Sequence, residues 1–254
     1  MINDFQMIVH ELAEDLEYVN LYPIGDVHIG SPDFDLEQWN KWKKMVSLDA
    51  NGYILMVGDM LDNGLKHSKT DSYSATMRPR EQKAWLTEEL RPLADRILGA
   101  CQGNHEARSA KESDDCPLYD VMAKLDLEDY YRESMAFIKI NLGFKRSDRQ
   151  WSYGVVLGHG ASMNKVKQFS YAIDGMDVLV TGHTHDARSH FFNKIVMDTK
   201  NNVVRLVGYT HLVVPSFQKM GGYALKAMYL PQDHRKIPVL RLSGTKKEVS
   251  VLWL

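Results

Sequence analysis

Positions 53–62 of this chain read Tyr53-Ile54-Leu55-Met56-Val57-Gly58-Asp59-Met60-Leu61-Asp62. The first five residues form a short apolar run between two glycines, which is typical of a strand covered on both faces of a sheet. Gly58 lets the backbone turn sharply at the end of that strand. The stretch therefore predicts a buried strand that ends in a carboxylate.

The same alternation of short apolar strands and amphipathic helices runs through the first 180 residues. We predict strands over 16–24, 53–57, 97–101, 155–157 and 178–180, and helices over 36–48, 81–90 and 117–125, with Pro92 ending or kinking the second helix. After position 185 the pattern predicts strands over 194–198, 203–207, 224–230, 238–242 and 248–253, with hairpin turns at 201–202 and 243–245. No linker or internal repeat interrupts the pattern, and we predict one domain over 1–254.

The composition excludes several classes of protein. A chain of 254 residues with 44% hydrophobic and 25% charged residues can bury a core without disulfides. Its net charge of −2 provides no global field for gripping nucleic acid or an anionic membrane, although a local basic patch stays open. No stretch is apolar enough to span a bilayer, so we expect no membrane partner.

Two features bear on the compartment. Cys101 and Cys116 are the two cysteines of the chain, and we expect both to be free thiols in a reducing environment. The acidic segment 1–20 lacks the basic start and apolar run of a secretion signal. Both features predict a cytoplasmic protein.

Five short motifs carry side chains that bind metals. Four of them begin where a predicted apolar strand ends, and in sheets covered by helices ligands gather beyond the strand ends. Imidazole nitrogens and carboxylate oxygens together hold divalent metals of intermediate hardness. One such motif alone is usually a turn or a half-buried histidine, but five in this arrangement predict a metal site. The motifs are Asp26-Val27-His28, Gly58-Asp59-Met60-Leu61-Asp62, Gly103-Asn104-His105-Glu106, Gly158-His159 and Gly182-His183-Thr184-His185.

The set resembles the calcineurin-like metallophosphoesterase superfamily, whose pattern is DxH, GDxxD, GNH(D/E), GH and GHxH. The match covers positions 26–185, and every motif is intact. The resemblance implies an α/β fold, a four-layer α-β-β-α sandwich of two mixed sheets flanked by helices, in which the C-terminal strands complete the second sheet. It also implies two divalent metal ions that together activate a hydroxide for phosphoester hydrolysis.

Carried over position by position, the resemblance assigns the ligands. It places Asp59 as a bridge between the two ions, His105 as the general acid and Asp62 as the carboxylate that orients His105 and keeps it protonated. Glu106 is expected to be a structural hydrogen-bond acceptor. We expect manganese to support activity in vitro, with iron, zinc, nickel or cobalt also fitting the ligands. The first ion is assigned to Asp26, His28, Asp59 and His185, and the second to Asp59, Asn104, His159 and His183.

One departure from the pattern bears on the substrate. Where protein phosphatases of the superfamily carry a phosphate-binding arginine, this chain has Asn63. A phosphomonoester carries about two negative charges and a diester one, so the missing cation favours a diester. The loop 65–73 mixes basic, hydroxyl and aromatic groups, which suits either a nucleic-acid strand or a solvated loop. Candidate substrate contacts are Asn63, His67, Arg78, Arg80 and Arg108.

Three hypotheses follow for the function. The first is a binuclear-metal hydrolase of phosphodiesters, with a nucleic acid or nucleotide as partner. The second is a phosphomonoesterase acting on a protein or small metabolite. The third is a non-catalytic binding scaffold, which the complete ligand set disfavours. The oligomeric state is open, since Trp39, Trp42 and the C-terminal aromatic residues suit an interface as well as a core.

Overall fold

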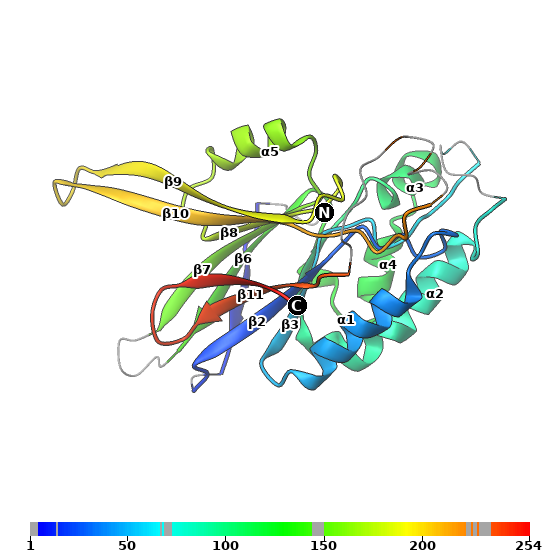
Figure 1. Cartoon of the computed structure of the whole chain (residues 1–254), viewed down its shortest axis with the longest axis horizontal. Helices are drawn as coiled ribbons and strands as arrows, with labels where there is room; N and C mark the ends of the chain where they lie inside the picture. Colours follow the sequence, from blue (N-terminus) through cyan, green and yellow to red (C-terminus); the bar gives the residue numbers. More distant parts are fainter. Residues whose placement is uncertain are drawn as a thin grey trace.

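Two six-stranded sheets of mixed direction form the centre of the fold in this computed structural model (Figure 1). The structure describes residues 5–13, 15–66, 68, 73–143, 150–221, 225, 228 and 235–254. Sheet A contains, in spatial order, β1 (Ile8–Glu11), β6 (Met135–Leu142), β7 (Trp151–Gly158), β8 (Val178–Thr181), β10 (Val203–Val213) and β9 (Arg188–Asp198). Sheet B contains β12 (Val249–Trp253), β11 (Pro238–Ser243), β2 (Tyr18–Ile24), β3 (Gly52–Met56), β4 (Ile97–Cys101) and β5 (Tyr131–Arg132).

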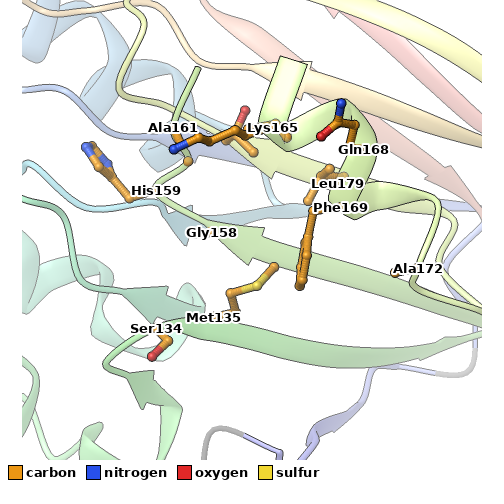
Figure 2. A pocket seen from close by; sticks show the side chains of 13 residues that line it. Ser134, Met135, Gly158, His159, Ala161, Lys165, Gln168, Phe169, Ala172 and Leu179 are labelled. Carbon is orange, nitrogen blue, oxygen red and sulfur yellow. The ribbon is translucent and has the colours of Figure 1, made fainter. Parts of the chain in front are cut away.

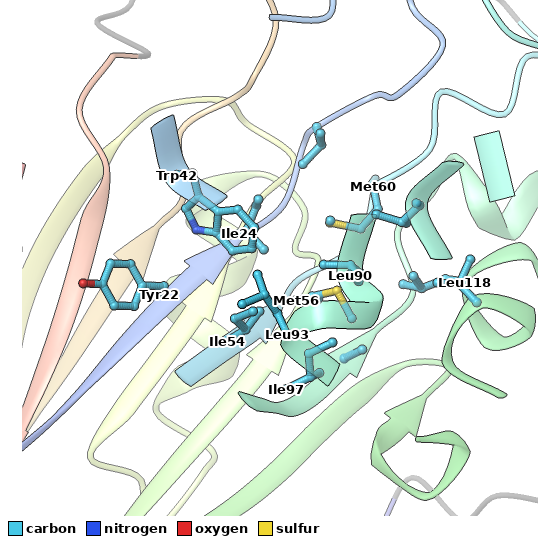
Figure 3. Packing of buried hydrophobic residues seen from close by; sticks show 14 of the residues in the cluster. Tyr22, Ile24, Trp42, Ile54, Met56, Met60, Leu90, Leu93, Ile97 and Leu118 are labelled. Atoms are coloured by element: carbon cyan, nitrogen blue, oxygen red, sulfur yellow. The ribbon is translucent and has the colours of Figure 1, made fainter. Parts of the chain in front are cut away.

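Helices cover the outer face of each sheet. The helices α1 (Leu36–Leu48), α2 (Pro79–Leu90) and α4 (Pro117–Ala123) share one apolar core with β2, β3 and β4 of sheet B (Figure 3). The helix α5 (Met163–Ser170) packs on the outer face of sheet A, where Val166 meets Val156 and Leu179. A further core lies between the two sheets. The predicted four-layer α-β-β-α sandwich is therefore confirmed.

The helix α1 shows how local sequence sets these elements. Its N-cap is Asp35, whose side chain accepts hydrogen bonds from the backbone N–H groups of Glu37 and Gln38. Trp39, Trp42 and Val46 then fall on one face and are fully buried against sheet B. Both tryptophans are thus core residues of the chain.

The helix α2 is followed by a 3₁₀ turn, η1 (Arg91–Arg96), which contains Pro92 and confirms the predicted break. The remaining elements are α3 (Glu106–Ser113), directly after β4, and a second 3₁₀ turn, η2 (Glu128–Tyr130). None of the helices in the described ranges is long and apolar enough to cross a bilayer.

The expectation that the C-terminal strands all complete one sheet is wrong. The strands β9 and β10 join sheet A, because β10 pairs with β8. The strands β11 and β12 return to sheet B, where β11 pairs antiparallel with β2. The predicted strand 224–230 falls outside the described residues except for Leu225 and Met228, which lie in no strand. The strands β1, β5 and β6 and the helices α3 and α5 were not predicted.

Candidate binuclear metal centre

The five motifs meet at one edge of the two sheets. Each follows the carboxyl end of a strand: Asp26 follows β2, Asp59 follows β3, Asn104 follows β4, His159 follows β7 and His183 follows β8. A hydrogen bond links the two sheets at this edge, because the backbone N–H of His183 donates to Asp26 Oδ2 at 2.8 Å. The fold thus brings together side chains that lie far apart in the sequence.

The first ligand group consists of Asp26, His28 and His185. His185 Nε2 lies 3.4 Å from Asp26 Oδ1 and 3.3 Å from His28 Nε2. One ligand atom from each residue lies within 4.8 Å of the others, a spacing that one metal ion can bridge. Asp26 and His28 are buried, so their polar atoms face the site and not bulk water.

The second ligand group consists of Asp59, Asn104, His159 and His183. His159 Nε2 lies 3.1 Å from Asp59 Oδ2 and 3.0 Å from Asn104 Oδ1. Asn104 Oδ1 also lies 2.7 Å from His183 Nδ1. A neutral amide oxygen, a carboxylate oxygen and two imidazole nitrogens therefore face one another, as a cation site requires.

A third set of ligand atoms joins the two groups. His28, Asp59 and His105 also present ligand atoms within 4.8 Å of one another, and the rings of His28 and His105 lie 4.4 Å apart. Asp59 thus belongs to two sets, in agreement with a bridging position. The sequence did not predict that His105 would lie at ligand distance.

Asp62 positions His105 in a different way from the one predicted. The ring Nδ1 of His105 lies 2.7 Å from the backbone carbonyl oxygen of Asp62, whereas the carboxylate Oδ1 is 3.6 Å away. Burial lowers the pKa of His105, and the charge of Arg108 adds to this, although Asp59 opposes it. The expected hydrogen bond from His105 to the carboxylate of Asp62 is therefore not formed. The backbone carbonyl fixes the ring instead.

The buried carboxylates raise the pKa of two histidines of the site. Burial by itself lowers the pKa of His159, but the hydrogen bond and the charge of Asp59 outweigh it and raise this pKa to about 10. The pKa of His185 is raised in the same way by Asp26. A histidine must be neutral to bind a metal, so His159 and His185 would bind a cation in the neutral form, and the cation would supply the positive charge beside Asp59 and Asp26.

The residues present fit divalent cations. Among the described residues, the buried Oδ1 atom of Asp26 accepts no hydrogen bond of ordinary geometry and has the His185 ring 3.4 Å away, an arrangement that a cation between them would stabilise. Burial and the charge of His105 lower the pKa of His28 to about 3, so its ring is neutral and ready to bind. Each of the two ligand groups could thus hold a cation, and Asp59, which is also within ligand distance of His28, could serve both.

Comparisons with known proteins agree with this geometry. The family model described as calcineurin-like phosphoesterase matches residues 21–187, about two thirds of the chain. The chain belongs to this family. It is therefore a metallophosphoesterase with candidate His and Asp metal sites. A comparison with curated protein sequences finds no significant match.

Several solved structures are similar to this metallophosphoesterase. A metallophosphoesterase from Sphaerobacter thermophilus has 13% sequence identity and a TM-score of 0.46, with 93% of this chain and 88% of that chain covered. The calcineurin-like phosphoesterase YfkN from Bacillus subtilis has 11% identity and a TM-score of 0.44, with 93% and 90% covered. Vps29 from Entamoeba histolytica, complexed with zinc, has 13% identity and a TM-score of 0.40, with 93% and 98% covered.

The backbone of the metallophosphoesterase is strained at the site. Positive φ angles are uncommon outside glycine and cost on the order of 1–3 kcal/mol each. Backbone hydrogen bonds hold the strained segments, since the N–H groups of Val27 and His28 both donate to the carbonyl oxygen of Asp59. The strain therefore aims side chains that a relaxed loop would point elsewhere. Five predicted ligands have this conformation: Asp26, His28, Asp59, His183 and His185.

Glu106 ties two of the motifs together. The side chain is fully buried, and Oε2 accepts hydrogen bonds from the N–H groups of Asp59 and Gly103, each at 3.0 Å. Oε1 accepts from the N–H of Leu61 at 3.0 Å. Burial and the nearby charge of Asp59 raise the pKa of Glu106 to about 7, against the effect of the N–H donors. The expected role as a structural hydrogen-bond acceptor is confirmed.

Two motif glycines, Gly58 and Gly103, lie where the backbones of two loops come close together. A Cβ atom on Gly58, whose φ is +79°, would lie 2.3 Å from the backbone nitrogen of Gly103. A Cβ on Gly103 would lie 2.1 Å from the backbone nitrogen of Asp59. No side chain fits at such distances. The segments after β3 and β4 can therefore touch only as glycine to glycine.

Asn63, a predicted substrate contact, is turned into the protein and is not open to solvent. It is fully buried, and Nδ2 donates to the His105 carbonyl oxygen and to Ser109 Oγ, each at 2.8 Å. Its backbone N–H donates to Gln82 Oε1 at 2.9 Å. Asn63 supports the loop that carries His105, and the sequence offered no signal for the contributions of Ser109 and Gln82.

The basic residues predicted to contact substrate differ in their distance from the metal centre and in their exposure. Arg108 lies near the centre, because its charge acts on two groups there: it opposes the burial that raises the pKa of Asp62 to about 6, and it adds to the burial that lowers the pKa of His105. Arg78 is the exposed N-cap residue of α2, and Arg80 is exposed in the first turn of that helix. His67 falls outside the described residues.

An apolar pocket adjoins the metal centre, and the sequence did not predict it. It has a volume of about 710 Å³ and lies between α5 and the active-site end of sheet A. Met135, Phe169 and Leu179 line it, and in the view of Figure 2 the metal-site residue His159 and Lys165 lie toward one end. The lining residues come from separate elements, so no local sequence pattern could reveal the pocket.

Proposed function

We propose that this metallophosphoesterase hydrolyses phosphodiesters, with two divalent metal ions at the first and second ligand groups. The observation that carries the proposal is that two ligand groups lie at one edge of the fold and that Asp59, a member of the second group, is also within ligand distance of His28 in the first. Two ions at such a site provide a hydroxide near neutral pH and neutralise charge on the phosphate. We expect manganese to support activity in vitro, with iron, zinc, nickel or cobalt also suited to these ligands.

The side chains around the metal centre supply proton transfer and position. The Asp62 carbonyl oxygen holds His105 Nδ1, so Nε2 is turned toward the site and lies 3.8 Å from Asp59 Oδ2. Because Nδ1 donates to the carbonyl oxygen, Nε2 carries a proton only when the ring is cationic, and in that form it can give this proton to the leaving oxygen of the ester. Glu106 and Asn63 keep the loops that carry Asp59 and His105 in place.

Two observations support a diester as the substrate. Asn63 is neutral, so this position supplies no cation for the second charge of a monoester. The pocket beside His159 offers apolar space for a second ester group. A flat nucleobase suits its Phe169 and Met135 walls, so a nucleotide or nucleic-acid diester is the substrate class we favour.

One observation favours phosphomonoester hydrolysis as the second candidate. The positive charge of Arg108 acts on both Asp62 and His105, so it lies near enough to attract the extra charge of a phosphate dianion. Arg108 would then replace the family's arginine from a different position on the fold, on α3.

The test compares two model substrates. Protein stripped of metal and reconstituted with manganese should hydrolyse bis-p-nitrophenyl phosphate with a kcat/KM at least about tenfold higher than that for p-nitrophenyl phosphate. Release of p-nitrophenol measures both rates. A preference for the monoester would overturn the diester proposal and favour the Arg108 alternative.

A pocket-filling variant separates binding in the pocket from chemistry at the metals. Ala172 lines the pocket and is exposed, so Ala172→Trp should fill it without disturbing the core. We expect KM for the diester to rise while the monoester is unaffected. Ala50→Trp, at an exposed position after α1, is the matched control.

His105→Ala should retain both metal ions and lose about 10²–10⁴ in kcat on a diester with an alkyl leaving group. Such a leaving group needs a proton, whereas p-nitrophenolate needs little help, so the loss should be small with bis-p-nitrophenyl phosphate. Metal content measured alongside the rates distinguishes a proton donor from a ligand. Loss of one ion would mean that His105 is a ligand, as its distance from His28 and Asp59 also allows.

A further inference from the structure

The strands β9 and β10 form an arm that extends beyond the rest of sheet A (Figure 1). They pair antiparallel along their whole length, from Val203↔Asp198 to Val213↔Arg188. The strand β8 pairs with β10 only over Thr210–Val213. The outer part of the arm is therefore a two-stranded ribbon, which is marginally stable in water unless something packs against it.

One face of this arm is apolar and exposed. Residues directly opposite each other in an antiparallel pair share a face, as Met197 and Val204 do, and Ile195 and Leu206. The polar residues on this face are Ser189, Asn193 and Thr210, and none of its residues is charged. We name five of its side chains the arm stripe: Phe191 (68% exposed), Ile195 (74%), Met197 (74%), Val204 (66%) and Leu206 (70%).

The opposite face of the arm is partly covered by the chain itself. The ring of Phe192 stacks on Tyr209 with centroids 5.4 Å apart. The side chain of Lys194 donates to the carbonyl oxygen of Ile173 at 2.9 Å and pairs with Asp174, beyond the end of α5. The chain thus covers one face of the arm and leaves the arm stripe open.

We propose that the arm stripe is a self-association surface that packs against the same stripe of a second copy of this chain. At these exposed fractions five large side chains present roughly 700 Å² of surface, close to the ~800 Å² that each partner of a standard interface buries. Exposed apolar patches of this size mark interaction sites. An isologous pairing needs one surface that complements itself, and a stripe without charge meets that condition.

The chemistry of the stripe favours a second copy over other partners. A nucleic acid would need lysine or arginine on this face, and the face has neither, since Lys194 and Arg205 alternate with the stripe and lie on the opposite face. A net charge of −2 gives no general attraction to an anionic bilayer. A two-fold pairing of stripes buries apolar side chains from both copies and leaves no charge unpaired.

Sedimentation velocity of the full chain between about 1 and 200 µM tests the proposal. The wild-type protein should sediment as a dimer of 29.1 kDa chains. The double variant Ile195→Lys/Leu206→Lys should sediment as a monomer, with self-association weakened by about 30-fold or more. The control Leu48→Lys replaces an equally exposed leucine, 76% exposed at the end of α1, and should remain a dimer.

Circular dichroism of the double variant should match that of the wild type, because both substituted side chains face solvent in the single chain. A wild-type protein that stays monomeric over the whole range would overturn the proposal, whether or not it binds vesicles or nucleic acid. A dimer that persists in the double variant would overturn it as well. Neither result depends on the proposed hydrolysis, which is measured separately on the same samples.

Discussion

Asp59→Asn is expected to remove one metal ion and to lower kcat by at least about 10³-fold. In other hydrolases, loss of a single donor that stabilises the developing charge costs about 10²–10³ in kcat. Asp59 Oδ2 lies 3.1 Å from His159 Nε2 and 3.8 Å from His105 Nε2, so it faces both halves of the site. Its other oxygen, Oδ1, accepts a hydrogen bond from the backbone N–H of His105 at 2.7 Å. An asparagine can keep that bond only by turning its NH₂ group toward the metals, and NH₂ is not a ligand.

The measurement combines metal content by mass spectrometry with kcat for bis-p-nitrophenyl phosphate in manganese. The matched control is Asp95→Asn, which removes an exposed carboxylate on η1 and should keep two ions and full activity. If Asp59→Asn still held two ions and kept more than about a tenth of the wild-type kcat, the bridging assignment would be untenable.

The sequence predicts the metal centre well because its signal is local. Each motif follows a strand whose apolar run is visible in the sequence, and parallel neighbours carry their ends to the same edge. The buried strand β3 and the carboxylate of Asp59 lie where positions 53–59 predict them. The burial of Asn63 could not be predicted, because residue type alone does not decide whether a side chain is open to solvent.

Features that depend on pairing between distant segments could not be predicted. The strand β11 pairs with β2, more than 200 residues earlier in the chain, and nothing in either strand specifies that choice. The arm is longer than the pattern predicts, since β9 begins at Arg188 and the polar residues at its start hide the strand. The contact of His105 with the backbone carbonyl of Asp62 is also invisible, because every residue has a carbonyl group.

Substitution of Glu106 is expected to destabilise the fold and the metal centre together. At pH 8, above its pKa of about 7, the carboxylate accepts three buried backbone N–H groups, from Asp59, Leu61 and Gly103. In Glu106→Gln either orientation of the amide places NH₂ against at least one of them, which should lower the free energy of unfolding by about 2 kcal/mol. Glu106→Ala leaves all three unpaired beside a cavity and should cost about 5 kcal/mol.

Urea unfolding at pH 8 measures both losses, and the matched control is Glu112→Gln, an exposed glutamate on the same helix α3. The folded Glu106→Gln variant also separates positioning from mere stability. Asp59 and Gly103 are held by the same oxygen atom, so displacement of their backbones should weaken manganese binding even in protein that is fully folded. Full metal affinity in folded Glu106→Gln would show that the strained loops hold Asp59 and Asn104 without the glutamate. Reduced affinity, with Glu112→Gln unchanged, would show that the stability of the fold and the geometry of the metal centre both depend on the buried carboxylate of Glu106.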